Sequence, residues 1–137
     1  MQNFFILSVC CLLLSSCGSK TGGQDFTSVA GEVTYKGQPI LDGVIRLSPA
    51  TGTQAPARTT QIKSGRYQFT ERNAVKSGTY QVEIYAYRGG SSLPGDKTAD
   101  SPEREQILPE QFNTQSEIEV LQVQTGNGEI QQDYHFN

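Results

Sequence analysis

Few side chains in this chain of 137 residues have the chemistry needed for catalysis. The three cysteines, Cys10, Cys11 and Cys17, all lie near the amino terminus, and His135 is the single histidine. The rest of the chain therefore has no thiol for a disulfide, a metal ion or a nucleophile. Because no nucleophile–base set or metal-ligand set can be assembled, we expect a protein that is not an enzyme and holds no cofactor.

His135 lies between two aromatic residues, Tyr134 and Phe136, near the end of the chain. If these aromatic side chains face a core, strand alternation turns His135 towards solvent, on the same face as Asp133. An exposed histidine beside one carboxylate can form a weak pair, but it lacks a second group to act as a base or a ligand. We therefore interpret His135 as a surface residue.

Acidic side chains gather between Gly89 and Glu105, in a stretch without hydrophobic periodicity. Asp96 and Asp100 could offer oxygen ligands to Ca²⁺, together with Glu103 and Glu105, yet the spacing matches no EF-hand loop. The favoured interpretation is a loop of solvated charge that is either functional or mobile. Asp96 and Asp100 are thus weak metal candidates.

An aromatic stripe follows the strongest strand signal in the chain. From Tyr80, alternate residues are apolar on one face, and Tyr85 and Tyr87 fall on the other, next to Arg88. Exposed tyrosine with arginine is typical of protein-binding patches, and aromatic rings also stack on sugars. The alternative is that a second sheet or a neighbouring strand covers both rings. Tyr85, Tyr87 and Arg88 are the candidate binding residues.

Short apolar alternations separated by turn residues predict the strands that position these side chains. Two similar phrases, Ser64-Gly65-Arg66-Tyr67 and Ser77-Gly78-Thr79-Tyr80, each combine a turn with the start of a strand. The pattern predicts an all-β fold, a seven-stranded antiparallel β-sandwich, with Glu117–Gln124 and Ile130–Phe136 as its last strands. The predicted core is Val29, Val33, Ile45, Leu47, Ile62, Tyr67, Phe69, Tyr80, Val82, Ile84, Ile118, Val120, Tyr134 and Phe136.

The first residues are typical of an export address. Phe4 to Leu14 is apolar except for Ser8, and as a helix it would span roughly 16 Å, which is too short for a bilayer. Leu14-Ser15-Ser16-Cys17 resembles a bacterial lipobox, although no Lys or Arg precedes the apolar run. The resemblance implies a signal peptide over 1–16, acylation of Cys17 with chains such as palmitate, and a tether over 17–28.

Residues 29–137 form the remaining domain, and several of its phrases match a known family. Val29-Ala-Gly-Glu-Val-Thr-Tyr-Lys-Gly-Gln-Pro-Ile40, Gly65-Arg66-Tyr67 and Leu108-Pro109-Glu110-Gln111-Phe112-Asn113 resemble the carboxypeptidase regulatory-like, transthyretin-like domains of bacterial surface lipoproteins. In the metallocarboxypeptidases, this domain is a non-catalytic appendage. The resemblance therefore implies a fold and an anchor, and no reaction.

The sequence does not favour either of two reactions known in related sandwiches, hydrolysis of hydroxyisourate and formation of an isopeptide bond. Tyr87-Arg88-Gly89-Gly90-Ser91 is similar to the terminal motif of hydroxyisourate hydrolases, but it lies mid-chain and those enzymes need more than one histidine. Lys36, Glu83, Asp133 and Asn137 have the residue types of a Lys–Asn isopeptide bond. However, Lys36 falls in a turn, Asn137 ends the chain and Glu83 faces outward by alternation.

These observations predict a lipid-anchored protein of the bacterial cell envelope, facing the periplasm or the exterior. It would bind a protein or polysaccharide through the Tyr85 and Tyr87 face or the 89–105 loop, with a purely structural envelope role as the alternative. The membrane is the expected partner of acylated Cys17. A net charge of −3 without a Lys/Arg cluster speaks against nucleic acid.

We predict that the protein extracted from membranes begins at Cys17 and carries acyl chains. Intact mass spectrometry should show the loss of residues 1–16 and a gain equal to the lipid, and Cys17→Ser should abolish both changes. An unmodified chain with residues 1–16 retained would contradict the lipobox interpretation.

Overall fold

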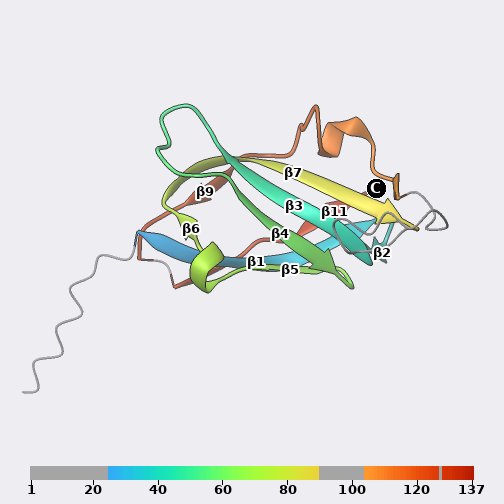
Figure 1. Cartoon of the computed structure of the whole chain (residues 1–137), viewed down its shortest axis with the longest axis horizontal. Coiled ribbons are helices and arrows are strands. Elements are labelled where there is room, and N and C mark those ends of the chain that lie inside the picture. The colour runs from blue at the N-terminus through green and yellow to red at the C-terminus, as the bar shows by residue number, and fades with distance from the viewer. Residues whose placement is uncertain (1–24, 90–103, 127) are drawn as a thin grey trace, which may run out of the picture.

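The computed structural model describes residues 25–89, 104–126 and 128–137 (Figure 1). In chain order the elements are β1 (Phe26–Tyr35), β2 (Gln38–Pro39), β3 (Asp42–Pro49), β4 (Arg58–Lys63), β5 (Arg66–Phe69), η1 (Glu71–Asn73), β6 (Val75–Lys76), β7 (Gly78–Arg88), β8 (Glu105–Gln106), η2 (Glu110–Phe112), β9 (Leu121–Val123), β10 (Glu129–Gln131) and β11 (Tyr134–Phe136). Within these ranges, no helix is long and apolar enough to cross a bilayer. Cys17, Asp96 and Asp100 lie outside the described residues.

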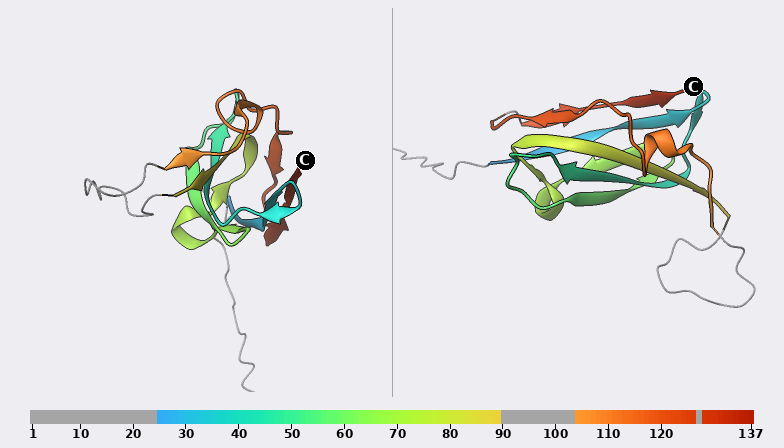
Figure 2. Two further views of the ribbon diagram at one scale, coloured as in Figure 1. Left: turned by 90° about the vertical axis from the view of Figure 1, so that its right-hand side faces the viewer. Right: turned by 90° about the horizontal axis from the view of Figure 1, so that it is seen from above.

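The strands form one curled sheet that wraps around a single core. Seven strands follow one another in the order β10-β1-β5-β4-β3-β7-β8, and the shorter β2, β6, β9 and β11 pair beside them. The end-on view in Figure 2 shows the strands surrounding the interior. Most ladders are antiparallel, which confirms the predicted all-β, sandwich-like architecture.

The strand predicted to be the strongest is β7, and it is the longest in the structure. Its residues alternate as expected, with Tyr80, Val82 and Ile84 fully buried and Tyr85 and Tyr87 half-buried on the opposite face. β7 pairs with β3 at seven consecutive positions, from Gly43↔Ala86 to Pro49↔Tyr80. This long ladder gives the molecule a rigid central ribbon.

Two of the predicted turns connect the strands of hairpins, and the two central residues of each turn have positive φ. Lys36 and Gly37 have φ of 51° and 75° between β1 and β2, and Ser64 and Gly65 have φ of 49° and 78° between β4 and β5. Two-residue turns of this hand match the twist of the strands that they connect. Glycine at the second position is therefore required by backbone geometry.

The buried core contains most of the apolar residues predicted for it. Tyr134 is 7% exposed, while Ile118 and Phe136 are partly buried against the core. Val120, in contrast, is 42% exposed, so its predicted place in the core is wrong. Further core residues that the prediction did not include are Ile40, Val75, Ala86, Leu108, Leu121 and Val123.

The predicted strand over Glu117–Gln124 forms only in its second half, because the ladder with β7 begins at Leu121. Before that point side chains bond the segment to β7: Ser116 Oγ donates to the Val82 carbonyl, and Gln81 Nε2 donates to the Ser116 carbonyl at 3.2 Å. These side chains replace the ladder, and Val120 is left facing outward.

The first and last strands run in parallel, which departs from the fully antiparallel pairing predicted. β1 pairs with β10 over Ser28↔Glu129 to Ala30↔Gln131, and with β11 over Val33↔Tyr134 to Tyr35↔Phe136. The right-hand view of Figure 2 shows the red carboxyl-terminal strands running beside the blue β1. The predicted last strand, Ile130–Phe136, is therefore present as two short pieces in one register.

Between these two pieces the chain passes close to β1 at Gly31. A Cβ atom built at Gly31 would lie 1.8 Å from the carbonyl oxygen of Gln132. The same carbonyl accepts a hydrogen bond of 2.6 Å from the buried Tyr67 hydroxyl on β5. Glycine at position 31 thus permits the contact that joins β5, β1 and the carboxyl terminus.

We predict that Gly31→Ala lowers the free energy of unfolding by about 1–3 kcal/mol, because the added methyl group must displace the Gln132 backbone. Gly128→Ala is the matched control, since its new Cβ would meet no atom within 4 Å. It should change stability by less than about 0.5 kcal/mol. Urea unfolding measures both, and equal effects would contradict the close approach.

Candidate functional site

The predicted binding residues lie on the outward face of the β3–β7 ribbon. Tyr85 is opposite Val44, and Arg46 is opposite Glu83, with Arg46 Nε and Glu83 Oε2 3.7 Å apart. Partial burial raises the pKa of the Tyr85 hydroxyl, and the neighbouring Glu83 carboxylate adds to this shift. The Tyr85 hydroxyl is therefore neutral at physiological pH and can act as a hydrogen-bond donor or acceptor.

Tyr87 is covered by one side chain from another segment. The guanidinium carbon of Arg104 lies 4.1 Å from the centroid of the Tyr87 ring. Arg104 also forms an ion pair of 2.6 Å with Asp42 Oδ2, at the start of β3. Arg104 thus joins β3 to β7 across the outer face. Its guanidinium covers one face of the Tyr87 ring and makes that face less accessible to a partner.

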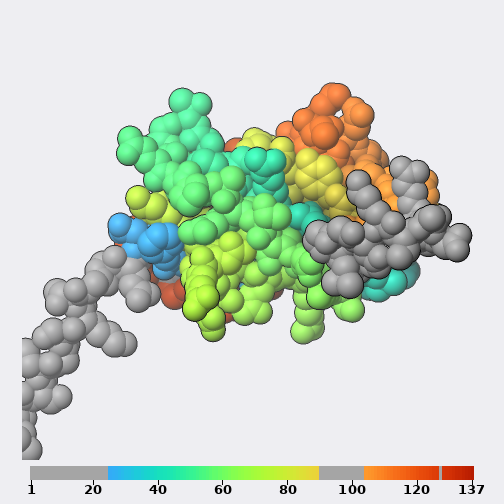
Figure 3. Space-filling model, viewed as in Figure 1, coloured from blue at the N-terminus to red at the C-terminus, as the bar shows by residue number. Residues whose placement is uncertain are grey.

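Arg88 is exposed at the end of β7, where it is the strand-register partner of Glu105 in β8. Figure 3 shows the orange segment that follows residue 103 lying beside the yellow end of β7. The side-chain oxygen of Gln106 in this segment accepts the Ala86 N–H at 2.9 Å. The outer face therefore carries Val44, Arg46, Tyr85 and the Arg104–Tyr87 pair, with Arg88 at its end.

His135 and Asp133 face solvent, as predicted, but each has its own partner. Thr34 Oγ1 lies 2.8 Å from His135 Nδ1. Asp133 Oδ1 accepts the Glu32 backbone N–H and the Gln131 side-chain N–H, both at 2.8 Å. These bonds hold the pKa of the Asp133 carboxyl below its ordinary value, with a smaller contribution from nearby His135. The Asp133 side chain thus accepts the Glu32 N–H at a position where β1 and the last strand form no backbone bond.

The structure does not bring the four residues of the isopeptide pattern into one cluster, although the Lys36 N–H donates to the Phe136 carbonyl at 2.7 Å, next to Asn137. Lys36 occupies the turn after β1, with its Nζ 5.1 Å from the Tyr35 ring, and Glu83 pairs with Arg46 on the outer face. No hydrogen bond or ion pair joins any two of Lys36, Glu83, Asp133 and Asn137, all of which the structure describes. In the described part of the chain, no three His, Cys, Asp or Glu side chains gather into a metal-binding group.

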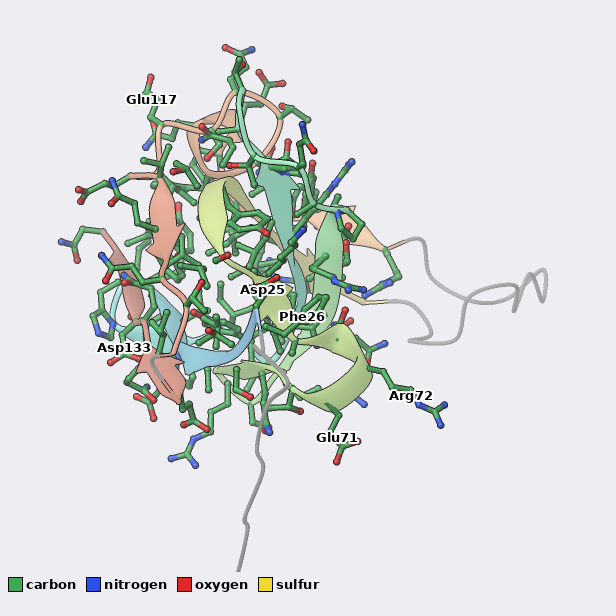
Figure 4. All side chains as sticks on the ribbon, turned by 90° about the vertical axis from the view of Figure 1, so that its left-hand side faces the viewer. Asp25, Phe26, Glu71, Arg72, Glu117 and Asp133 are labelled. Atoms are coloured by element: carbon green, nitrogen blue, oxygen red, sulfur yellow. The ribbon has the colours of Figure 1, made fainter. Side chains whose placement is uncertain are left out.

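A groove that the sequence did not reveal runs between Glu117–Gln122 and the β10–β11 edge. Its volume is about 650 Å³. Figure 4 shows Glu117 and Asp133, one from each wall, on the side of the molecule formed by the orange and red segments. The groove is lined by Phe112, Glu117, Ile118, Glu119, Val120, Leu121, Gln122, Ile130, Gln132, Asp133, Tyr134, His135 and Phe136.

One sequence signal could have pointed to this groove. Apolar residues change parity between Val120 and Leu121, and this change marks where the chain leaves the β7 ladder. The opposite wall gives no such signal, because its pairing with β1 joins residues 101 positions apart. The groove is thus a product of tertiary structure.

No family model, curated protein or solved structure matches this chain.

We predict that Asp133 makes the stability of the fold depend on acidity. Its pKa is lower in the folded chain than its ordinary value of 3.8, so its contribution is complete above that value and is lost as the pH falls through the folded pKa. In urea unfolding, the gap in stability between the wild type and Asp133→Asn should shrink below about pH 4. Glu71→Gln, on the exposed η1 turn, is the control. A gap that stays constant with pH would contradict the assigned bonds.

Proposed function

We propose that this protein is a lipid-anchored, non-enzymatic component of the bacterial cell envelope that binds a protein or a polysaccharide through its outer β3–β7 face. The observation that carries the proposal is the position of Tyr85. Its ring is half-buried near one end of the longest ladder, opposite Val44 and close to the Arg46–Glu83 pair. An aromatic ring held on a rigid strand binds at a low entropic cost.

The composition of this face supports a binding role. Tyrosine and arginine are enriched in protein interfaces, and tyrosine rings also stack on sugar rings. Arg46 is half-exposed, with 51% of its side chain accessible, so it keeps donors free for a partner while it pairs with Glu83.

The anchor proposed from the lipobox agrees with the placement of this face. The tether that follows Cys17 would enter the domain at Phe26, the first residue of β1. In Figure 1 the start of β1 and the carboxyl end of β7 lie at opposite ends of the molecule. A chain anchored through Cys17 would therefore hold the Tyr87 and Arg88 end of the outer face away from the lipid surface.

The Arg104 contact favours a second candidate, a purely structural envelope protein. Arg104 already occupies the ring face of Tyr87 and pairs with Asp42, as a clamp between strands would. In that case, the aromatic stripe would stabilise the fold and bind nothing.

The two candidates predict different results for one pair of substitutions. Tyr85→Ala with Tyr87→Ala should weaken capture of envelope proteins or glycans by the full chain at least about tenfold, since interface tyrosines often contribute 1–2 kcal/mol each. Gln68→Ala, an exposed residue of β5, is the control. Pull-down and glycan-array binding are the measurements. Failure to capture any partner with the wild type would favour the structural role.

A further inference from the structure

The two walls of the groove differ: β10 and β11 form the edge of a sheet, whereas Glu117–Val120 lies outside the strands. In the part of the chain that the structure describes, β10 and β11 pair only with β1. The facing wall, Glu117–Val120, precedes the ladder between β9 and β7, which ends at Tyr80↔Leu121. The curled sheet is therefore left open along this side.

Backbone groups of the last strand point into this opening. Gln132 donates its N–H to the Ala30 carbonyl at 2.8 Å, and Phe136 accepts the Lys36 N–H at 2.7 Å, so these two residues face β1. In a parallel ladder, residues of the other parity direct their N–H and C=O groups away from that neighbour. Gln131, Asp133 and His135 consequently offer their backbone groups to the groove.

Part of the groove lining is apolar. Ile118 and Ile130 are partly buried, one on each side, and Val120 is 42% exposed. Phe112 and Phe136 stack with their ring centroids 4.1 Å apart at one end. Apolar side chains beside an open strand edge are suited to an added strand, whose alternate side chains would cover them.

The rim of the groove is acidic. Glu117, Glu119 and Asp133 line it, and none of the described lining residues is Lys or Arg. Glu117 and Glu119 are exposed, and Ile118 between them is partly buried. An incoming strand would therefore meet carboxylates at the rim and the apolar side chain of Ile118 beside them.

The charge distinguishes between possible occupants. A second copy of this chain that docked by the same edge would bring its own carboxylates against these, and like charges facing each other across strands are destabilising. A strand with basic side chains would instead be attracted by all three carboxylates. The acidic rim therefore disfavours self-association and favours a cationic partner.

From these features we infer that the groove between Glu117–Val120 and β10–β11 binds an extended, basic segment of a partner polypeptide as an additional strand. The edge from Glu129 to Phe136 is about 26 Å long, which accommodates roughly eight residues of strand. The preferred sequence alternates Lys or Arg with Val or Ile. This site is separate from the outer β3–β7 face and does not depend on it.

The test uses the full chain in mild detergent and three fluorescent eight-residue peptides. The first alternates lysine and valine. The second replaces each lysine with glutamate. The third keeps the lysines and replaces each valine with proline, which removes the backbone N–H donors at those positions. Binding is followed by fluorescence anisotropy at about 0.1 M salt, and by hydrogen exchange of the Asp133 and His135 backbone amides.

Two variants with the same net charge test the location. Glu117→Lys with Glu119→Lys reverses charge at the groove, whereas Asp25→Lys with Glu71→Lys reverses it on exposed residues elsewhere (Figure 4). The Lys/Val peptide should bind the wild type and the second variant alike, and bind the groove variant at least about tenfold more weakly. It should also slow exchange at Asp133 and His135.

Several outcomes would overturn the inference. Equal weakening in both variants would show unspecific attraction, and equal binding of the proline peptide would show that no strand is added. Lack of binding by the Lys/Val peptide, or protection only of amides outside the groove, would likewise reject it. A concentration-dependent dimer in sedimentation that is lost in the groove variant would also overturn it, because the occupant of the groove would then be a second copy of this chain.

Discussion

The structure depends on the pairing of its first strand along both edges. On one edge, β1 bonds in succession to β6, β5 and β2, and on the other to β10 and β11. A strand with neighbours on both sides has its backbone polar groups satisfied without water, so its inner face can be buried in the core. Val29 and Val33 of β1 are accordingly fully buried. Every other strand is reached from β1 through this network.

The closure by the carboxyl terminus uses specific side chains where the ladder is interrupted. Gly31 makes room for the Gln132 carbonyl, Tyr67 donates to that carbonyl, and Asp133 accepts the Glu32 N–H that has no strand partner there. Burial raises the pKa of both Tyr67 and Tyr134, so both hydroxyls stay neutral under all ordinary conditions. The close approach at Gly31 and the hydrogen bonds of Tyr67 and Asp133 thus keep the last strand in register with β1.

Local patterns in the sequence predict the central ribbon because its determinants are local. The alternation from Tyr80 to Tyr87 gives both the strand and its two faces, and Ser64-Gly65 gives a hairpin. The parallel pairing of β1 with β11 has no such signal, because it joins residues far apart in the chain through side-chain contacts that only the folded state creates. The exposure of Val120 has a related cause, since the side-chain bonds of Ser116 and Gln81 replace the ladder with β7 before Leu121. The candidate site divides in the same way: the outward face of Tyr85 and Tyr87 follows from alternation, but the contact of Arg104 with Tyr87 and the groove do not.

The segment from Arg104 to Val123 determines what both candidate surfaces expose. It carries Arg104, which covers Tyr87, and it also forms the Glu117–Val120 wall of the groove. Its ladders with β7 are short, with two and three paired positions, whereas β3 pairs with β7 at seven. Between β8 and β9 it is held by the buried Leu108 side chain and by hydrogen bonds from side chains such as Ser116 and Gln81, each bond worth about 0.5–1.5 kcal/mol. With fewer ladder bonds, this part of the fold opens at a lower free energy than the β3–β7 ribbon does. Movement of this one segment would therefore change the access to Tyr87 and the width of the groove together, and it would uncover the part of the core that Leu108 fills.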